Sequence, residues 1–225
     1  MLYILVLCVF FAASETSVLS SLGEIGSLEP NDKFRCLVIK LSSKHFLTTQ
    51  LCAAKIGKNS RLYHPQISST VITTTKYNEY YTLGGYNNIA TVTTSNALAN
   101  IKNVKILQTV VKPGQYRVLF IGGETVVTVL GDKVCLGKRF ASNNYHVVDP
   151  KREICAVVQN GMNKLSDHTI ASGAVLLSPN NDHFIGLLSL ADAFNDGSKQ
   201  TLLFTRLPAY CNYLSMKTDN TFKCT

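Results

Sequence analysis

Short apolar runs rich in Val, Ile, Thr and Tyr recur along most of the chain, separated by turn-forming residues. β-Branched and aromatic residues favour the half-buried surface of a sheet. The runs predict strands over residues 35–41, 69–75, 79–83, 104–111, 116–121, 125–130, 154–158, 174–177, 184–190 and 201–205. So many short strands predict an all-β barrel or sandwich. Around residues 207–216 the apolar spacing changes next to Pro208, which predicts a short terminal helix.

Residues 1–14 are apolar and uncharged, and the stretch ends in small residues before Glu15. This pattern is typical of a cleaved secretory signal peptide. A membrane span needs about 20 apolar residues, so this stretch is too short, and no later stretch is long enough. We therefore expect a secreted, extracellular protein without a membrane span, whose mature domain covers residues 15–225.

The cysteines fit the same compartment. The chain has seven cysteines, and removal of Cys8 with the signal peptide leaves an even number. In an oxidising compartment an even set indicates disulfides. Their order and spacing favour three pairs, namely Cys36 with Cys52, Cys135 with Cys155, and Cys211 with Cys224. The mature length of about 210 residues is enough for one large domain or two small ones.

The segment between Cys36 and Cys52 carries a family resemblance. Leu47 and Thr48 stand shortly before the second cysteine. The segment resembles the histidine loop of trypsin- and chymotrypsin-like serine proteases, where L-T-A-A-H precedes that cysteine at the same spacing. The resemblance puts Leu51 where the family has its general base. A leucine side chain accepts no proton, so it cannot activate a nucleophile.

Three further segments resemble the same family, in the same order along the chain. Residues 86–92 resemble N-N-D-I-A-L-L, which puts Asn88 at the position of the buried aspartate. Residues 112–123 resemble the passage that opens the second barrel. Residues 167–176, followed by 184–189, resemble G-D-S-G-G-P-L and the strand after it, which puts Ser172 at the nucleophile position. Only the serine of the triad is therefore expected to be retained.

The resemblance implies other departures around that serine. It puts Ile170 at the oxyanion-hole position and Ser166 near the base of the specificity pocket. Ala171 replaces the aspartate that pairs with the new amino terminus after activation, and residues 15–35 contain no I-V-G-G activation motif. Losing both halves of a buried ion pair costs far less than losing one. The chain therefore resembles a protease that is not activated by cleavage.

The resemblance implies two six-stranded antiparallel Greek-key β-barrels, over about residues 33–108 and 109–225, with a short C-terminal helix. It also implies a pseudoprotease, similar to the secreted non-catalytic serine protease homologues found especially in insects. Such a protein is not an enzyme and binds an extracellular protease, substrate or inhibitor. It would act as a decoy, cofactor or regulator of extracellular proteolysis.

Two other functions stay open. A residual hydrolase would use Ser172 with another base, such as His168 or His45, although a lone serine hydroxyl is a weak nucleophile. The formal charge of +8 favours instead a basic extracellular protein that binds acidic glycans or microbial surfaces. Nucleic acid is not an expected partner, because no recognised binding motif is present.

Metal sites and cofactors are not expected. The five histidines are His45, His64, His146, His168 and His183. They show neither H-x-x-x-H nor Cys/His ligand spacing, and a zinc ion needs several convergent ligands. The cysteines are already assigned to disulfides.

Overall fold

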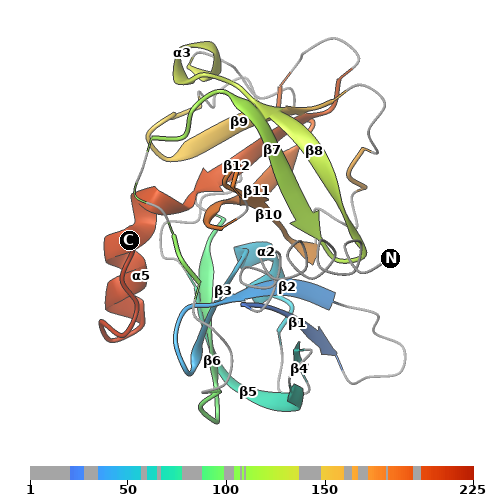
Figure 1. Ribbon diagram of the computed structural model, residues 1–225. Helices are drawn as coiled ribbons and strands as arrows, with labels where there is room; N and C mark the ends of the chain where they lie inside the picture. Colours follow the sequence, from blue (N-terminus) through green and yellow to red (C-terminus); the bar gives the residue numbers. More distant parts are fainter. Residues whose placement is uncertain are drawn as a thin grey trace, which may run out of the picture.

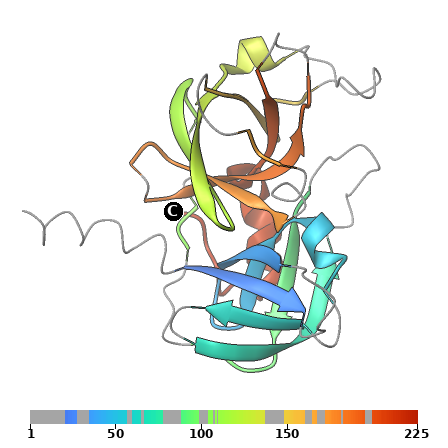
Figure 2. The same cartoon turned by 90° about the vertical axis from the view of Figure 1, so that its right-hand side faces the viewer.

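The computed structural model describes residues 21–27, 35–56, 60–64, 67–77, 88–98, 104–106, 108, 110–136, 148–159, 164–166, 172–180, 182–194 and 199–225. These residues form two closed β-barrels, one above the other in Figure 1, and a helix at the C-terminal end. Figure 2 shows the same two barrels from the side. The predicted signal peptide, the predicted strand at 79–83 and Cys8 lie outside the described residues.

The first barrel has six antiparallel strands and a short helix, α2 (Gln50–Ala53). The strands are β1 (Leu22–Ser27), β2 (Arg35–Lys40), β3 (His45–Thr48), β4 (Ser60–His64), β5 (Ile67–Tyr77) and β6 (Ala90–Thr94). Their order is β1-β2-β3-β6-β5-β4, and β1 closes the ring because it pairs with both β2 and β4. Closure leaves no free sheet edge.

The second barrel also has six antiparallel strands and one short helix, α3 (Asp132–Cys135). The strands are β7 (Gly114–Phe120), β8 (Gly123–Val129), β9 (Glu153–Val158), β10 (Ala174–Leu177), β11 (Phe184–Ala191) and β12 (Thr201–Arg206). Their order is β7-β8-β9-β12-β11-β10, and the pairing of β7 with β10 closes the ring. Both barrels therefore follow one strand order, and the predicted fold class is confirmed.

The β7–β8 hairpin shows how sequence sets local structure in this barrel. Gly122 has a φ of +92° in the turn, a backbone conformation that residues with a side chain rarely adopt and that glycine adopts readily. After the turn, Thr125, Val127 and Val129 are buried in alternation with less buried residues. This period of two directs one face of the strand into the barrel core.

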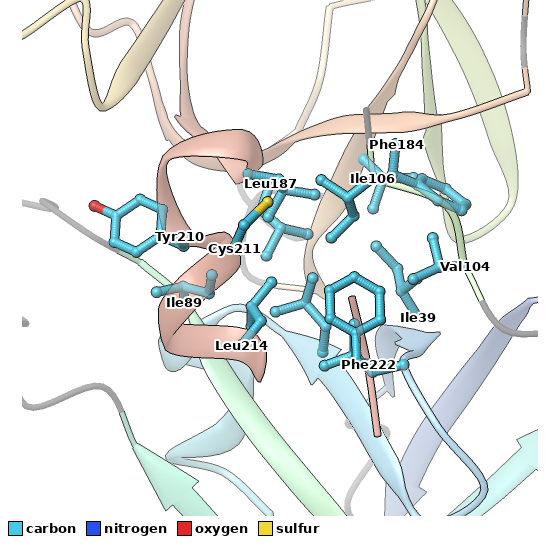
Figure 3. Close-up of a cluster of buried hydrophobic side chains, with 14 of the residues drawn as sticks. Ile39, Ile89, Val104, Ile106, Phe184, Leu187, Tyr210, Cys211, Leu214 and Phe222 are labelled. Carbon is cyan, nitrogen blue, oxygen red and sulfur yellow. The ribbon is translucent and has the colours of Figure 1, made fainter. Parts of the chain in front are cut away.

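The C-terminal segment packs at the junction of the two barrels. The 3-10 helix η1 (Leu207–Tyr210) leads into α5 (Cys211–Lys217), which confirms the predicted terminal helix. Figure 3 shows Leu214 of α5 in one apolar cluster with Ile39 of β2, Phe184 of β11, and Ile89, which directly precedes β6. Because this cluster draws on both barrels and the helix, it fixes the barrels relative to each other.

The three predicted disulfides are all present. They join Cys36 to Cys52, Cys135 to Cys155, and Cys211 to Cys224. The first fastens α2 to β2, the second fastens α3 to β9, and the third fastens the C-terminal tail to α5. Each bond therefore ties a short helix to a neighbouring segment.

Three sequence expectations on the fold need correction. The predicted strand at 104–111 is an inter-barrel linker, in which Ile106 forms an isolated parallel bridge with Phe184. The first barrel begins at β1, ahead of the predicted residue 33. Strands β1, β3 and β4 were not predicted, because they are short and lack a β-branched run that stands out from the flanking residues. Strand β6 was also missed, although four of its five residues are β-branched.

Candidate functional site

Asn88 joins three parts of the chain at the barrel junction. It is 1% exposed and lies just before β6. Its Oδ1 accepts hydrogen bonds from the backbone N–H groups of Gln50 at 2.7 Å and Leu51 at 3.1 Å. Its Nδ2 donates to the backbone oxygen of Leu188 in β11 at 3.3 Å. The amide oxygen therefore binds the start of α2, and the amide nitrogen binds the second barrel.

Leu51 lies in the first turn of α2, and its backbone N–H donates one of these bonds. Thr49 caps the helix, because its Oγ1 accepts a hydrogen bond from the N–H of Cys52 at 3.2 Å. The disulfide between Cys52 and Cys36 fixes the other side of the helix. The Leu51 side chain is nevertheless 38% exposed. A rigid helix therefore presents this leucine to solvent.

Ser172 reaches the same place from the second barrel. It is buried and precedes Gly173, whose φ of +82° suits glycine. A Cβ on Gly173 would lie 3.6 Å from Cγ2 of Thr49 and 3.9 Å from the backbone oxygen of Leu37. The turn that carries Ser172 thus lies against the start of α2. Asn88 is bonded to the backbone of Leu51, and the residue after Ser172 lies next to the cap of α2, so all three sequence-predicted positions lie near the start of α2.

These three side chains cannot carry a proton from serine to a leaving group. A general base needs a titratable group within hydrogen-bond reach of the nucleophile. Leucine has none, and the Asn88 amide is neutral and already bonded on both sides. His45, the alternative base, stands at the start of β3, whereas α2 follows the end of that strand. Its Nδ1 lies 2.7 Å from the Oγ of Ser42.

Among the other predicted positions around the serine, the structure describes Ser166. Ser166 is exposed and lies in a short described segment between β9 and β10. Ile170, Ala171 and His168 lie outside the described residues. Within the described part of the chain, no group of three His, Cys, Asp or Glu side chains could hold a metal ion. Among the same residues, no helix is long and apolar enough to cross a membrane.

Sequence reasoning missed two features of the site. One is the Leu188 backbone oxygen, which no pattern in the sequence marks as a partner of Asn88. The other is a buried hydroxyl pair, in which Oγ of Ser189 lies 2.7 Å from Oγ1 of Thr205. Ser189 ends the segment 184–189 that resembles the family strand. That resemblance was the feature of the sequence that could have pointed to this hydroxyl pair.

No protein-family model and no curated protein matches the sequence of the chain. Solved structures match its fold. The scabies mite inactivated protease paralogue S-I1 has a TM-score of 0.67 at 14% identity, over 90% of this chain and 96% of that chain. Kallikrein-related peptidase 10 in complex with Zn²⁺ has a TM-score of 0.63 at 14% identity, over 91% and 96%. The chain therefore has the trypsin-like serine protease fold.

Replacement of Asn88 by alanine tests how the junction is held. Asn88→Ala removes one acceptor from two N–H groups and one donor from a carbonyl. We expect a loss of about 2 kcal/mol in the free energy of unfolding, because water can replace part of these bonds at the exposed end of α2. Urea denaturation measures the loss. The exposed Asn212 on α5 provides a matched control, because Asn212→Ala should change stability by less than about 0.5 kcal/mol.

Proposed function

We propose that this chain is a secreted, catalytically inactive serine protease homologue that acts by binding a protein. In this role it serves as a decoy, cofactor or regulator of extracellular proteolysis. The observation that carries the proposal is the pair of hydrogen bonds from Gln50 and Leu51 to Asn88. In an active member of the family, the aspartate of the triad would stand at the position of Asn88 and the histidine at that of Leu51. Here these side chains are an amide and a hydrocarbon.

The chemistry of the two substitutions supports loss of catalysis. Serine attack requires an imidazole that takes the hydroxyl proton, and a carboxylate that stabilises the imidazolium. Leu51 supplies no proton acceptor, and Asn88 supplies no negative charge. Loss of the triad typically lowers kcat by about a million-fold. Ser172 without these partners is an ordinary hydroxyl.

Secretion is supported by the signal-like residues 1–14 and by the three disulfides. Disulfides persist in extracellular compartments and are rare in the cytosol. One neighbour by fold, the scabies mite protein, is an inactivated protease paralogue according to its description. It offers a precedent for keeping this fold without the activity.

The proposed protein-binding surface is centred on Leu51. An apolar side chain that is 38% exposed on a rigid helix loses little conformational entropy when it is covered by a partner. A partner that covered Leu51 would also remove its apolar surface from water, which favours association. We assign the partner contact to the junction face around α2, where Leu51 takes the place of a catalytic side chain.

Cross-linking of the mature protein in its native secreted fluid, with mass spectrometry of the captured proteins, tests this assignment. Leu51→Arg should lower capture of the specific partner at least tenfold, because the charge disrupts an apolar contact. Leu136→Arg is the matched control, since Leu136 is 63% exposed just after α3. We expect this control to capture the partner like the wild type.

Two results would contradict the proposed binding mode. One is equal capture by the Leu51→Arg variant and the wild type, which would place the contact elsewhere. The other is equal loss with both arginine variants, which would indicate a general effect of charge. Thermal denaturation of each variant confirms that it is folded before capture is compared.

A further inference from the structure

The disulfide between Cys211 and Cys224 differs from the other two in its access to solvent. The four cysteines of the other two bonds are each at most 1% exposed. Cys211 is 7% exposed and Cys224 is partly exposed. A thiolate that breaks a disulfide must reach one of its sulfur atoms, so reactivity depends on access. Of the three disulfides, Cys211–Cys224 is therefore the one that is open to attack from solvent.

The chain reverses its direction after α5. Asp219 and Asn220 have φ values of +52° and +59°. Residues with a side chain adopt this left-handed conformation at a cost in free energy, and Asp and Asn are the ones that tolerate it best. After this pair, residues 221–225, which we call the tail, return to the first residue of α5, where Cys224 is bonded to Cys211.

The tail covers part of the apolar cluster between the barrels. Phe222 is 3% exposed and belongs to this cluster, and Cys224 packs against it, whereas Thr221 and Lys223 are exposed. This alternation is typical of an extended segment with one buried face. Figure 3 shows the ring of Phe222 among side chains from both barrels. The tail therefore has one large apolar anchor.

The end of the tail is hydrogen bonded to the inter-barrel linker. The N–H of Thr225 donates to the backbone oxygen of Ile106 at 3.1 Å, and the N–H of Gln108 donates to the backbone oxygen of Thr225 at 3.0 Å. Both bonds involve the same tail residue, which is exposed. Hydrogen bonds at an exposed position add little net free energy, because water competes for the same groups.

These contacts are too few to hold the tail without the disulfide. Ordering the backbone of a segment of this length costs more free energy than one buried phenylalanine and two exposed hydrogen bonds recover. The cross-link lowers that cost, because it keeps the ends of the loop between Cys211 and Cys224 together when the tail is not docked. Docking of the tail therefore depends on the state of this bond.

We propose that the Cys211–Cys224 disulfide is a redox latch, which a dithiol reductant opens to release the tail from the barrel junction. One thiolate of the reductant attacks Sγ of Cys224, the S–S bond breaks, and its electron pair goes to Sγ of Cys211. The second thiolate of the reductant then attacks the reductant's own sulfur in the mixed disulfide and displaces the Cys224 thiolate. The reductant is oxidised to a disulfide, and its two protons end on the two protein thiols.

Release of the tail changes the surface at the barrel junction. Phe222 leaves the apolar cluster, so its ring and the side chains that it covers become accessible. The backbone oxygen of Ile106 and the N–H of Gln108 lose their partners in the tail. Exposed apolar patches favour association with other proteins. The redox state of the surroundings thus selects between a covered and an uncovered junction, and this switch does not rest on the proposed protein-binding surface around Leu51.

Reduction of the folded wild type with dithiothreitol, without denaturant, tests the chemistry of the latch. Alkylation and mass spectrometry then locate the free thiols. Cys211 and Cys224 should be alkylated at least roughly tenfold faster than the four other bonded cysteines, because those are buried. A sample reduced in guanidinium chloride, where all the disulfides open, is the control for detection of every cysteine.

Hydrogen exchange of single amides, followed by NMR, tests release of the tail. Reduction should speed exchange at Gln108 and Thr225 at least roughly tenfold, because each of these N–H groups donates a bond between tail and linker. Val104 is the matched control, since it lies in the same linker but donates to the backbone oxygen of Lys40 in β2 at 2.8 Å. Its exchange should change less than about twofold.

The double variant Cys211→Ser/Cys224→Ser should show the fast exchange at Gln108 without any reductant. Slow exchange in this variant would contradict the latch. So would equal alkylation rates for all three disulfides, reduction of Cys211–Cys224 without faster exchange at Gln108, or no reduction in the absence of denaturant. The wild-type measurements decide the question even if the variant does not fold. They need no binding partner, so failure of the latch is distinguishable from failure of the proposed protein binding.

Discussion

The free energy of unfolding should fall by about 3 kcal/mol as the pH rises from about 4.5 to 7.5, because of a single carboxyl group on β9. Glu153 is 4% exposed. Burial raises its pKa from 4.5 to about 7; the N–H of Asp149, 2.8 Å from Oε2, lowers the pKa, and the charge of Asp149 raises it. The guanidinium of the neighbouring Arg206 donates to the backbone oxygen of Glu153 and pairs with Asp132.

The sign follows from proton binding. Between its unfolded pKa of 4.5 and its folded pKa of about 7, Glu153 holds its proton in the native state and releases it on unfolding. The native state therefore binds more protons, so stability decreases as pH rises. The contribution is fully present below pH 4.5 and is lost as pH passes through the folded pKa. One pKa unit corresponds to about 1.4 kcal/mol, which gives the size of the change.

Urea denaturation at several pH values, on the wild type and on Glu153→Gln, measures this effect. The glutamine keeps an acceptor for the Asp149 N–H and removes the titration, so the pH dependence should flatten by about 3 kcal/mol. Glu124→Gln is the control, because Glu124 is half exposed and paired with Arg117 at the surface. An unchanged pH dependence in Glu153→Gln would show that another group is responsible.

Phe184→Ala should destabilise the protein by about 3–5 kcal/mol, the usual cost of removing a buried phenylalanine from a core. Phe184 is 1% exposed and packs in the cluster between the barrels, next to Ile106 in Figure 3. Its loss leaves a cavity at the point where the linker, the tail and β11 meet.

Urea denaturation of Phe184→Ala measures the loss. Val110→Ala is the control, because Val110 is in the same linker but 76% exposed, so its stability should change by less than about 0.5 kcal/mol. A loss below about 1 kcal/mol for Phe184→Ala would mean that the cluster does not hold the barrels together.

The sequence predicted the second barrel better than the first. Strands β7, β8, β9 and β12 are continuous runs with β-branched residues, so local preference and final structure agree. β1 contains Gly23 and Gly26 in six residues, and no local preference makes it a strand. It forms because β2 and β4 supply hydrogen bonds on both of its edges.

The linker shows the opposite error. Val104 and Ile106 are buried and Lys105 is exposed, which is the alternation of a strand. The alternation is real, but the backbone neighbours are Lys40 at the end of β2, Phe184 of β11 and Thr225 of the tail, so no long strand forms. Periodicity reports which face is buried, and it does not report how many partners a segment will find.

The candidate site likewise has a part that the sequence predicted and a part that it did not. The spacing of Cys36 and Cys52 and the run around Asn88 led to the prediction that Leu51 and Asn88 stand at degenerate positions, and the structure joins these two residues by a hydrogen bond. The contact of Asn88 with Leu188 and the bridge between Ile106 and Phe184 depend on segments that lie far apart in the sequence. Such contacts follow from barrel closure and tail docking, which single-sequence patterns do not specify.

We expect Ser172 to be an unreactive hydroxyl, although it lies in a trypsin-like fold. Intact-mass spectrometry after treatment of the folded protein with a fluorophosphonate probe measures its reactivity, with an active serine protease in the same tube as a positive control. We expect full labelling of the control and no adduct on this protein, as for its Ser172→Ala variant. An adduct that maps to Ser172 in the wild type and is absent from Ser172→Ala would contradict it.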